Sequence, residues 1–349
     1  MLAHYLDFHA VELSQLERIS RDPFSTVGFY REKQDALNKQ IWLHGKHLDK
    51  DAIYRFDKVF NIVDTLTVLD ACENEQIVKQ AFLQLIPSYN TDELYEFINA
   101  LYVTSNGKSL ARNIVIDGSL FHLLSDAISD IELIAFKLLF SEQPNGYFQQ
   151  LQEQEKHGLN WLLSPVGKGD DTATVITTFK WLVENNLIES SLMKLFLRRL
   201  DTEQVKLICN YSAQSLPEKD ALLILAKSGL VKYTNIVVSA LNDNMPSTEI
   251  ISEIRQTFGF RLEQLVPYEI QVSAYHGDEL ALDEFKKQFN AHWEAYLSQL
   301  TSDRLLCGHA LVDQLTAAEL EALDNQSYRF YQLYIRYLNV RTTALKGAA

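Results

Sequence analysis

Apolar residues recur at helical spacing along almost the whole chain. Near the start, residues spaced three and four apart fall on one face of a helix: Leu2, Tyr5, Leu6, Leu13, Leu16 and Ile19. This spacing is typical of an amphipathic helix. Strand-like alternation is rare. The best β candidate is NIVVSAL (235–241), and its helical neighbours favour a helix there too. The pattern therefore predicts an all-α fold.

The stretch GSLFHLLSDAISDIELIAFKLLF (118–140) predicts a helical hairpin. Its first helix is expected at Ser119–Ala127 and its second at Ile131–Phe140, with the two helices folded back on each other. A shift of 102 residues places this stretch on ALLILAKSGLVKYTNIVVSAL (221–241) without a gap, so that Leu120 falls on Leu222. The hairpin is therefore expected to recur along the chain.

Two further hairpins lie between these copies. One is GLNWLLSPVGKGDDTATVITTFKWLVEN (158–185), and the other is IESSLMKLFLRRLDTEQVKLICNYSA (188–213). Four such units from residue 118 to about 243 predict a stack of helical hairpins, in which each unit buries its apolar side against its neighbours. We expect an N-terminal helical region at 1–105, the hairpin region at 106–245 and a C-terminal helical region at 246–349.

The first hairpin resembles a degenerate ankyrin-type repeat. Ser119-Leu120-Phe121-His122 stands where that family has the start of its T-P-L-H-x-A signature, and DIELIAFKLL resembles its outer helix. The proline of the signature is absent from every copy, so another α-solenoid or an irregular α fold is the alternative. The resemblance implies a surface of loops and inner helices that binds protein partners, and a structural role for His122.

Composition narrows the classes of partner. The net charge of −14 disfavours binding to nucleic acid and to anionic membranes. The sequence contains no run of 18 apolar residues, so we expect no integral membrane segment. Three scattered cysteines, Cys72, Cys209 and Cys307, indicate a reducing compartment. We expect a cytoplasmic protein. Its Asn- and Glu-rich loops resemble those of proteins that intracellular bacteria deliver into host cells, so an effector in a host cytoplasm is one hypothesis.

Candidate catalytic groups are few. LLCGHAL (305–311) contains the best candidate nucleophile, Cys307. If the segment is helical, His309 points about 200° away from it, and the thiol needs another base such as His276 or His292. A buried structural cysteine is the alternative. These residues define the competing hypothesis of a thiol- or His-dependent hydrolase or transferase, with its site between the hairpin and C-terminal regions.

Cofactor and metal motifs are missing or incomplete. SNGKS (105–109) has the Gly-Lys-Ser end of a phosphate loop, but Tyr102 occupies the position where that loop needs glycine. His44 and His47 are three residues apart and could share a metal, although Gly45 between them favours a helix end with separate imidazoles. We therefore expect no cofactor and no metal site.

Two segments are candidates for partner binding. The Gly-rich SPVGKGDDT (164–172) predicts an elongated loop tip, where the candidate contact residues are Trp161, Lys168, Asp170 and Asp171. NQSYRFYQLYIRYLNVR (325–341) predicts a helix with two apolar faces, one of which carries Tyr334 and Tyr337. This second face is either buried between layers or open to a partner. We predict a non-catalytic interaction protein that binds another protein with a basic or mixed surface.

Overall fold

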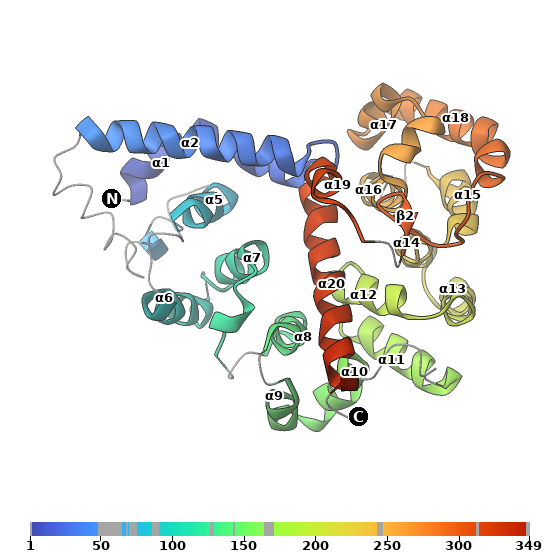
Figure 1. Ribbon diagram of the computed structural model, residues 1–349, viewed down its shortest axis with the longest axis horizontal. Coiled ribbons are helices and arrows are strands. Elements are labelled where there is room, and N and C mark those ends of the chain that lie inside the picture. Colours follow the sequence, from blue (N-terminus) through green and yellow to red (C-terminus); the bar gives the residue numbers. More distant parts are fainter. Residues whose placement is uncertain are drawn as a thin grey trace. The chain divides into compact units, whose positions relative to one another are not determined.

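The computed structural model is helical over most of its described length (Figure 1). It describes residues 2–47, 65–67, 69, 75–85, 91–105, 107–125, 129–141, 144–163, 171–242, 247–311 and 314–346. Within these ranges the only strands are the antiparallel pair β1 (Leu305–Leu306) and β2 (His309–Ala310). The predicted all-α class is confirmed.

The chain divides into two compact units, each described by itself below. Unit 1 comprises Met1–Gln150 with Asp324–Gln326, and unit 2 comprises Leu151–Leu323 with Ser327–Ala349. The predicted boundaries near residues 105 and 245 do not coincide with this division. In the part of the chain that is described, no helix is long and apolar enough to cross a membrane.

Unit 1 packs its helices around a small apolar core. Its elements are α1 (Leu2–Arg21), α2 (Val27–His47), α5 (Glu75–Leu85), α6 (Thr91–Tyr102), α7 (Lys108–Gly118), η2 (Phe121–Leu123), α8 (Ile131–Phe140) and α9 (Pro144–Gln150). Helix α5 packs against α1 and α7, and α7 packs against α6. Leu16, Val78 and Ile98 are buried, and the rings of Phe82 and Phe97 lie 5.1 Å apart.

The predicted helix at Ser119–Ala127 is wrong. Helix α7 ends at Gly118, and Ser119 takes a left-handed conformation with φ +54°. The amides of Ser119 and Leu120 donate to the carbonyls of Ile116 and Val115, which is the Schellman pattern that ends a helix. Among the residues described up to 125, the single 3₁₀ turn η2 follows. The second predicted helix, Ile131–Phe140, is confirmed as α8.

Unit 2 begins with three pairs of helices that match the later predicted hairpins. They are α10 (Glu153–Leu163) with α11 (Thr172–Glu184), α12 (Ser191–Arg199) with α13 (Thr202–Ser215), and α14 (Glu218–Lys227) with α15 (Val231–Ala240). Helix α13 packs against both α11 and α14. The helices are therefore present, whereas their arrangement as a solenoid or as ankyrin-type repeats stays a prediction.

The rest of unit 2 carries its aromatic core. It contains α16 (Ser247–Phe258), η3 (Gly259–Gln264), α17 (Tyr268–Tyr275), α18 (Glu279–Leu297), β1, β2, α19 (Ala317–Ala322) and α20 (Asn325–Lys346). The buried Phe258 ring contacts those of Phe289, Trp293 and Tyr296 at centroid distances of 6.5, 6.3 and 5.7 Å. Edge-to-face contacts of this kind stabilise a core beyond the area that they bury.

Local sequence signals fix where several of these helices start. Asp201 and Gln204 form a capping box at the start of α13, and Thr316 and Glu319 form another at α19. In each box the two side chains satisfy backbone amides that a helix leaves unpaired. Asp171 accepts a hydrogen bond from the Thr174 amide at the start of α11. These caps account for short helices joined by short loops.

Candidate functional site

The ends of three helices in unit 2 meet one short extended segment. We call Asp303–Gly308 the clip. The Leu305 amide donates to the Gly229 carbonyl just beyond α14, at 3.1 Å. The Cys307 and Gly308 amides donate to the Gln256 and Thr257 carbonyls in the last turn of α16, at 2.7 and 2.9 Å. The clip therefore satisfies carbonyls at helix ends that have no partner within their own helix.

Arg304 extends the clip to two helix ends at once. Its Nη2 donates to the Leu197 carbonyl at 2.8 Å and to the Ser228 carbonyl at 3.3 Å, and its Nη1 donates to the Leu200 carbonyl. A cation at a helix C-terminus is favoured because the helix dipole is negative there. Burial lowers the pKa of Arg304 to about 10, so its guanidinium stays charged at neutral pH.

Arg198 on α12 contacts the clip and is the largest fully buried side chain among the described residues, with 1% of its surface exposed. Its Nη1 donates to the Leu305 carbonyl and its Nη2 to Thr257 Oγ1 at 3.3 Å. Gly229, at φ +68°, packs directly on the guanidinium and leaves no room for a Cβ. Burial lowers the pKa of Arg198 to about 10 as well.

Two lysines complete a buried group of positive charges. Lys194 Nζ lies 2.7 Å from Glu253 Oε1, and Lys227 Nζ donates to the Ile188 carbonyl at 2.8 Å. Burial alone would raise the pKa of Glu253, but Lys194 and Lys227 outweigh it and hold that pKa below its usual value. We call Lys194, Arg198, Lys227 and Arg304 the cation cluster.

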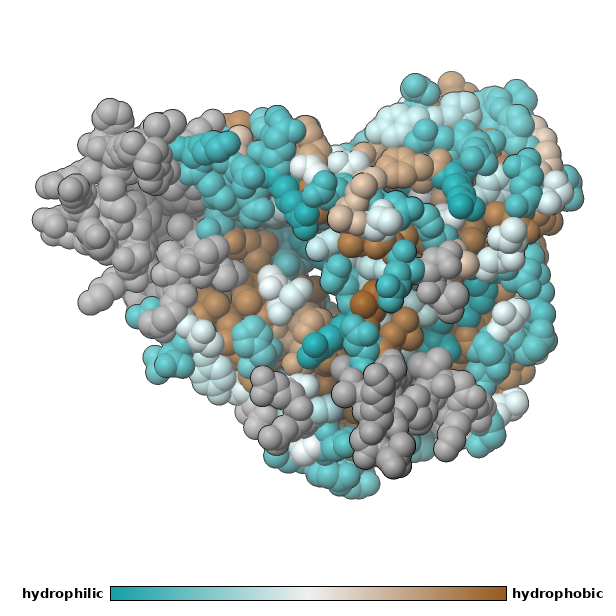
Figure 2. Space-filling view, in the orientation of Figure 1, coloured by the Kyte–Doolittle hydropathy of each residue, from teal (hydrophilic) through white to brown (hydrophobic). Residues whose placement is uncertain are grey.

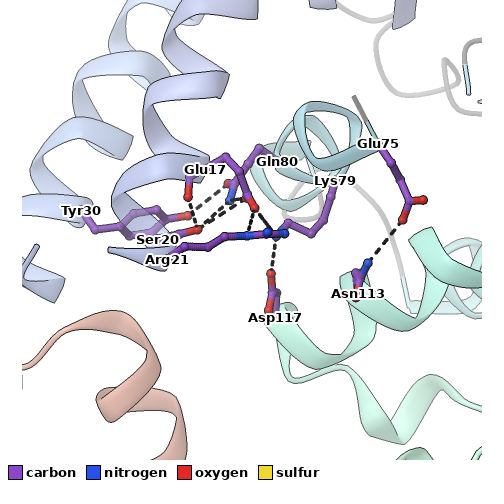
Figure 3. Close-up of polar contacts among 9 residues, drawn as sticks. All are labelled: Glu17, Ser20, Arg21, Tyr30, Glu75, Lys79, Gln80, Asn113 and Asp117. Atoms are coloured by element: carbon purple, nitrogen blue, oxygen red, sulfur yellow. Dashed lines mark hydrogen bonds and ion pairs between the residues drawn. The ribbon is translucent and has the colours of Figure 1, made fainter. Parts of the chain in front are cut away.

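Unit 1 contains a buried polar network of a different kind (Figure 3). Lys79 of α5 lies between Glu17 of α1, at 2.9 Å, and Asp117 of α7, at 2.7 Å. Gln80 Nε2 donates to Glu17 Oε2 at 2.7 Å, and Arg21 Nε lies 2.5 Å from Glu17 Oε1. Here two cations face two carboxylates, so the charge is balanced. We assign this network a structural role that joins α1, α5 and α7.

The clip also contains the candidate nucleophile, Cys307, which lies in a turn and not in a helix. Cys307 and Gly308 form the two-residue turn of the β1–β2 hairpin, both with positive φ of +54° and +81°. Gly259 approaches so closely that a Cβ there would lie 2.7 Å from the Cys307 carbonyl oxygen. The Cys307 side chain is buried, with 6% of the residue exposed. A thiol in this position has little access to a substrate.

The candidate bases lie in different surroundings. His309 follows the turn on β2, and its Nε2 lies 3.5 Å from Glu319 Oε1. His276 is exposed at the C-terminal end of α17. His292 is exposed on α18, and its Nδ1 lies 3.1 Å from the Leu265 carbonyl. Each imidazole is thus accounted for by a surface or capping position, and catalytic use of Cys307 stays a prediction.

Three of the six predicted partner-contact residues are buried. Trp161, Tyr334 and Tyr337 are 3%, 4% and 0% exposed, and the Trp161 and Tyr337 rings lie 6.1 Å apart. Asp171 is exposed, but it caps α11 and two hydrogen bonds from Thr174 lower its pKa. Lys168 and Asp170 lie outside the described residues.

Metal ligands do not gather in the described part of the chain, where no three His, Cys, Asp or Glu side chains are placed to hold an ion. The side chains of His44 and His47 lie outside it. No protein family, curated protein or solved structure that was compared with this chain matches it. The cation cluster, with the clip around it, is therefore the most distinctive site that the described residues form.

Sequence reasoning missed this cluster. Arg198-Arg199 stands between apolar residues in the sequence, a pattern that indicates a basic spot on a helix rather than a buried guanidinium. The partners of Arg198 could not be inferred, because the clip lies 107 residues further along the chain. Arg304, in the connection between α18 and α19, has no pattern around it that predicts burial.

Proposed function

We propose that this protein is a non-catalytic interaction protein that binds a basic partner protein through its acidic surface. One observation carries the proposal. Among the described residues six cations are buried but only two carboxylates: Lys79, Lys194, Arg198, Lys227, Arg255 and Arg304 against Glu17 and Glu132. The surface is therefore more acidic than the net charge of −14 implies, and Figure 2 has many hydrophilic side chains on the visible face.

Helix α6 in unit 1 offers the most suitable face. Asp92, Glu93 and Glu96 are exposed on it, and the helix itself contains no basic residue. Tyr95 stands among them with 42% of its surface exposed, which provides an aromatic anchor between the charges. Aromatic anchors inside a charged rim are a common feature of protein interfaces. A basic segment with one apolar side chain fits this face.

Enzymatic activity has weaker support. The described geometry places the candidate thiol in a buried, hydrogen-bonded turn. The role of the clip in satisfying helix ends explains its residues without catalysis.

A binding experiment tests the proposal. A photoreactive amino acid at Tyr95 would capture the partner in cells, and the recombinant partner would then be titrated against the purified chain. Neutralising α6 with Asp92→Asn, Glu93→Gln and Glu96→Gln should weaken binding by about tenfold or more and reduce its salt dependence. The matched control neutralises three exposed carboxylates that already have ion-pair partners: Glu153, Glu203 and Asp283.

The control variant changes the net charge by the same three units, so it should bind nearly as well as the natural chain. Equal losses in both variants would mean that net charge alone attracts the partner. No loss in either variant, or a captured partner that is itself acidic, would refute the proposal.

A further inference from the structure

The exposed face of α6 continues past its acidic first turn. Because each residue turns a helix by about 100°, one face about 100° wide holds five residues: Asp92, Tyr95, Glu96, Asn99 and Val103. Val103 follows α6 directly, and its amide donates to the Asn99 carbonyl at 3.3 Å, so it keeps the helical spacing. The other side of α6 is buried in the core of unit 1.

Two apolar side chains stand at a defined distance on this face. Tyr95 is 42% exposed and Val103 is 81% exposed. They are eight positions apart, which places them about 12 Å apart along the helix axis. Two residues of a partner reach across this distance if they are seven or eight positions apart in a helix, or about three or four apart in an extended chain.

The backbone of α6 favours the helical partner. A helix uses its own N–H and C=O groups internally, so α6 cannot add an extended strand as the edge of a sheet does. Between the two apolar residues, the side-chain amide of Asn99 donates to the Tyr95 and Leu123 carbonyls, at 2.8 and 2.7 Å. Both of its N–H groups are therefore used. A helical segment suits this face because its own backbone groups are already bonded.

The charges on this face give it a direction. Asp92, Glu93 and Glu96 are exposed in the N-terminal half of α6. At the other end the exposed Lys108 places its Nζ 5.3 Å from the centre of the Tyr102 ring. Basic residues of a partner are therefore attracted to the first half of α6 and repelled from its end. In a helix, basic residues are most favourable near the C-terminus.

We propose that the partner docks on this face as an amphipathic α-helix that runs antiparallel to α6. Two apolar residues, seven or eight positions apart, contact Tyr95 and Val103, and basic residues in the C-terminal half of the docked helix lie beside Asp92, Glu93 and Glu96. The proposal rests on the proposed function, because it specifies the form of the basic segment that α6 binds.

Photocrosslinking from two positions tests the arrangement. The full-length chain carries p-benzoylphenylalanine at Tyr95 in one variant and at Val103 in another, and mass spectrometry locates the labelled residues of the partner. We expect both probes to label one segment, at residues about seven or eight positions apart. The Tyr95 probe should label the residue nearer the C-terminus of that segment.

A synthetic peptide of the labelled segment then tests the apolar contact. Val103→Ser should weaken its binding to the full-length chain by about fivefold or more, because the partner no longer covers an apolar side chain there. Val11→Ser is the matched control, since Val11 is also exposed in unit 1, at 66%, but lies on α1. It should leave the affinity unchanged.

Labels about three or four residues apart would show an extended segment and overturn the proposal. So would labels in the opposite order, or an unchanged affinity in Val103→Ser. In each of these cases the proposed function still stands if neutralising α6 weakens binding of a basic partner. If neutralising α6 has no effect, or if the captured partner is a second copy of this acidic chain, the proposed function and this inference both fail.

Discussion

Gly229 is the position where one added methyl group should do most damage. Its backbone lies at φ +68°, and a Cβ there would overlap the guanidinium of Arg198. The overlap could be relieved cheaply only if that side chain were free to move. Arg198 is instead held by the Leu305 carbonyl and Thr257 Oγ1 in a fully buried setting. Gly229→Ala must therefore displace a fixed cation.

The expected magnitude follows from two contributions. A positive φ costs an alanine about 1–2 kcal/mol. Displacing the guanidinium loses two hydrogen bonds to a charged group, each worth about 1.5–3 kcal/mol. We expect Gly229→Ala to lower the free energy of unfolding of unit 2 by about 4 kcal/mol or more, a large part of the roughly 5–15 kcal/mol of a typical domain.

Gly277→Ala is the matched control, because Gly277 lies at φ +86° with nothing within 4 Å of the added Cβ. It should cost only the backbone contribution, about 1–2 kcal/mol. Urea unfolding followed by tryptophan fluorescence measures both. Equal losses at the two glycines would refute the assigned position of Arg198. In an Arg198→Met background the extra cost of Gly229→Ala should disappear, which a double-mutant cycle detects.

Three further predictions concern stability. Lys79→Met should cost about 3–5 kcal/mol in urea unfolding, since it removes the buried cation that lies between the carboxylates of Glu17 and Asp117; a loss below about 1 kcal/mol would contradict the network of Figure 3. Burial raises the pKa of Cys209 from 9.0 to about 12, so the thiol stays neutral when folded but ionises when unfolded above pH 9. The free energy of unfolding should then fall by about 1.4 kcal/mol per pH unit from this group as pH rises above 9, and Cys209→Ala should flatten that slope; an unchanged slope would argue against burial. Asp201→Ala removes the capping box of α13 and should cost about 1 kcal/mol in the same assay.

Helices could be predicted from the sequence wherever the apolar spacing was regular. Ile131–Phe140 and the helix around 235–241 lie where expected. The expected helix at Ser119–Ala127 failed because a serine, not a glycine, takes the left-handed position that ends α7. Backbone conformations of this kind are rarely visible in residue type alone.

The site was harder to predict than the fold. Cys307-Gly308 is a two-residue hairpin turn with both φ positive, a position where Asn-Gly or Asp-Gly is the usual signal. The apolar residues on either side, Leu306 and Ala310, fit a short strand as well as a helix. The buried arginines depend on carbonyls more than 100 residues away, and local patterns carry no information about such partners.

The clip has a consequence for how the chain is made. Arg198 of α12 is synthesised 107 residues before Leu305 of the clip, whose carbonyl accepts its hydrogen bond. Leu197 of α12 is likewise synthesised 107 residues before Arg304, which donates to its carbonyl. At roughly 5–20 residues per second this is a wait of about 5–20 seconds. During that time the end of α12 must remain open, and its lysine and arginine side chains stay hydrated. The end of α12 therefore gains these contacts only after Asp303–Gly308 has been synthesised.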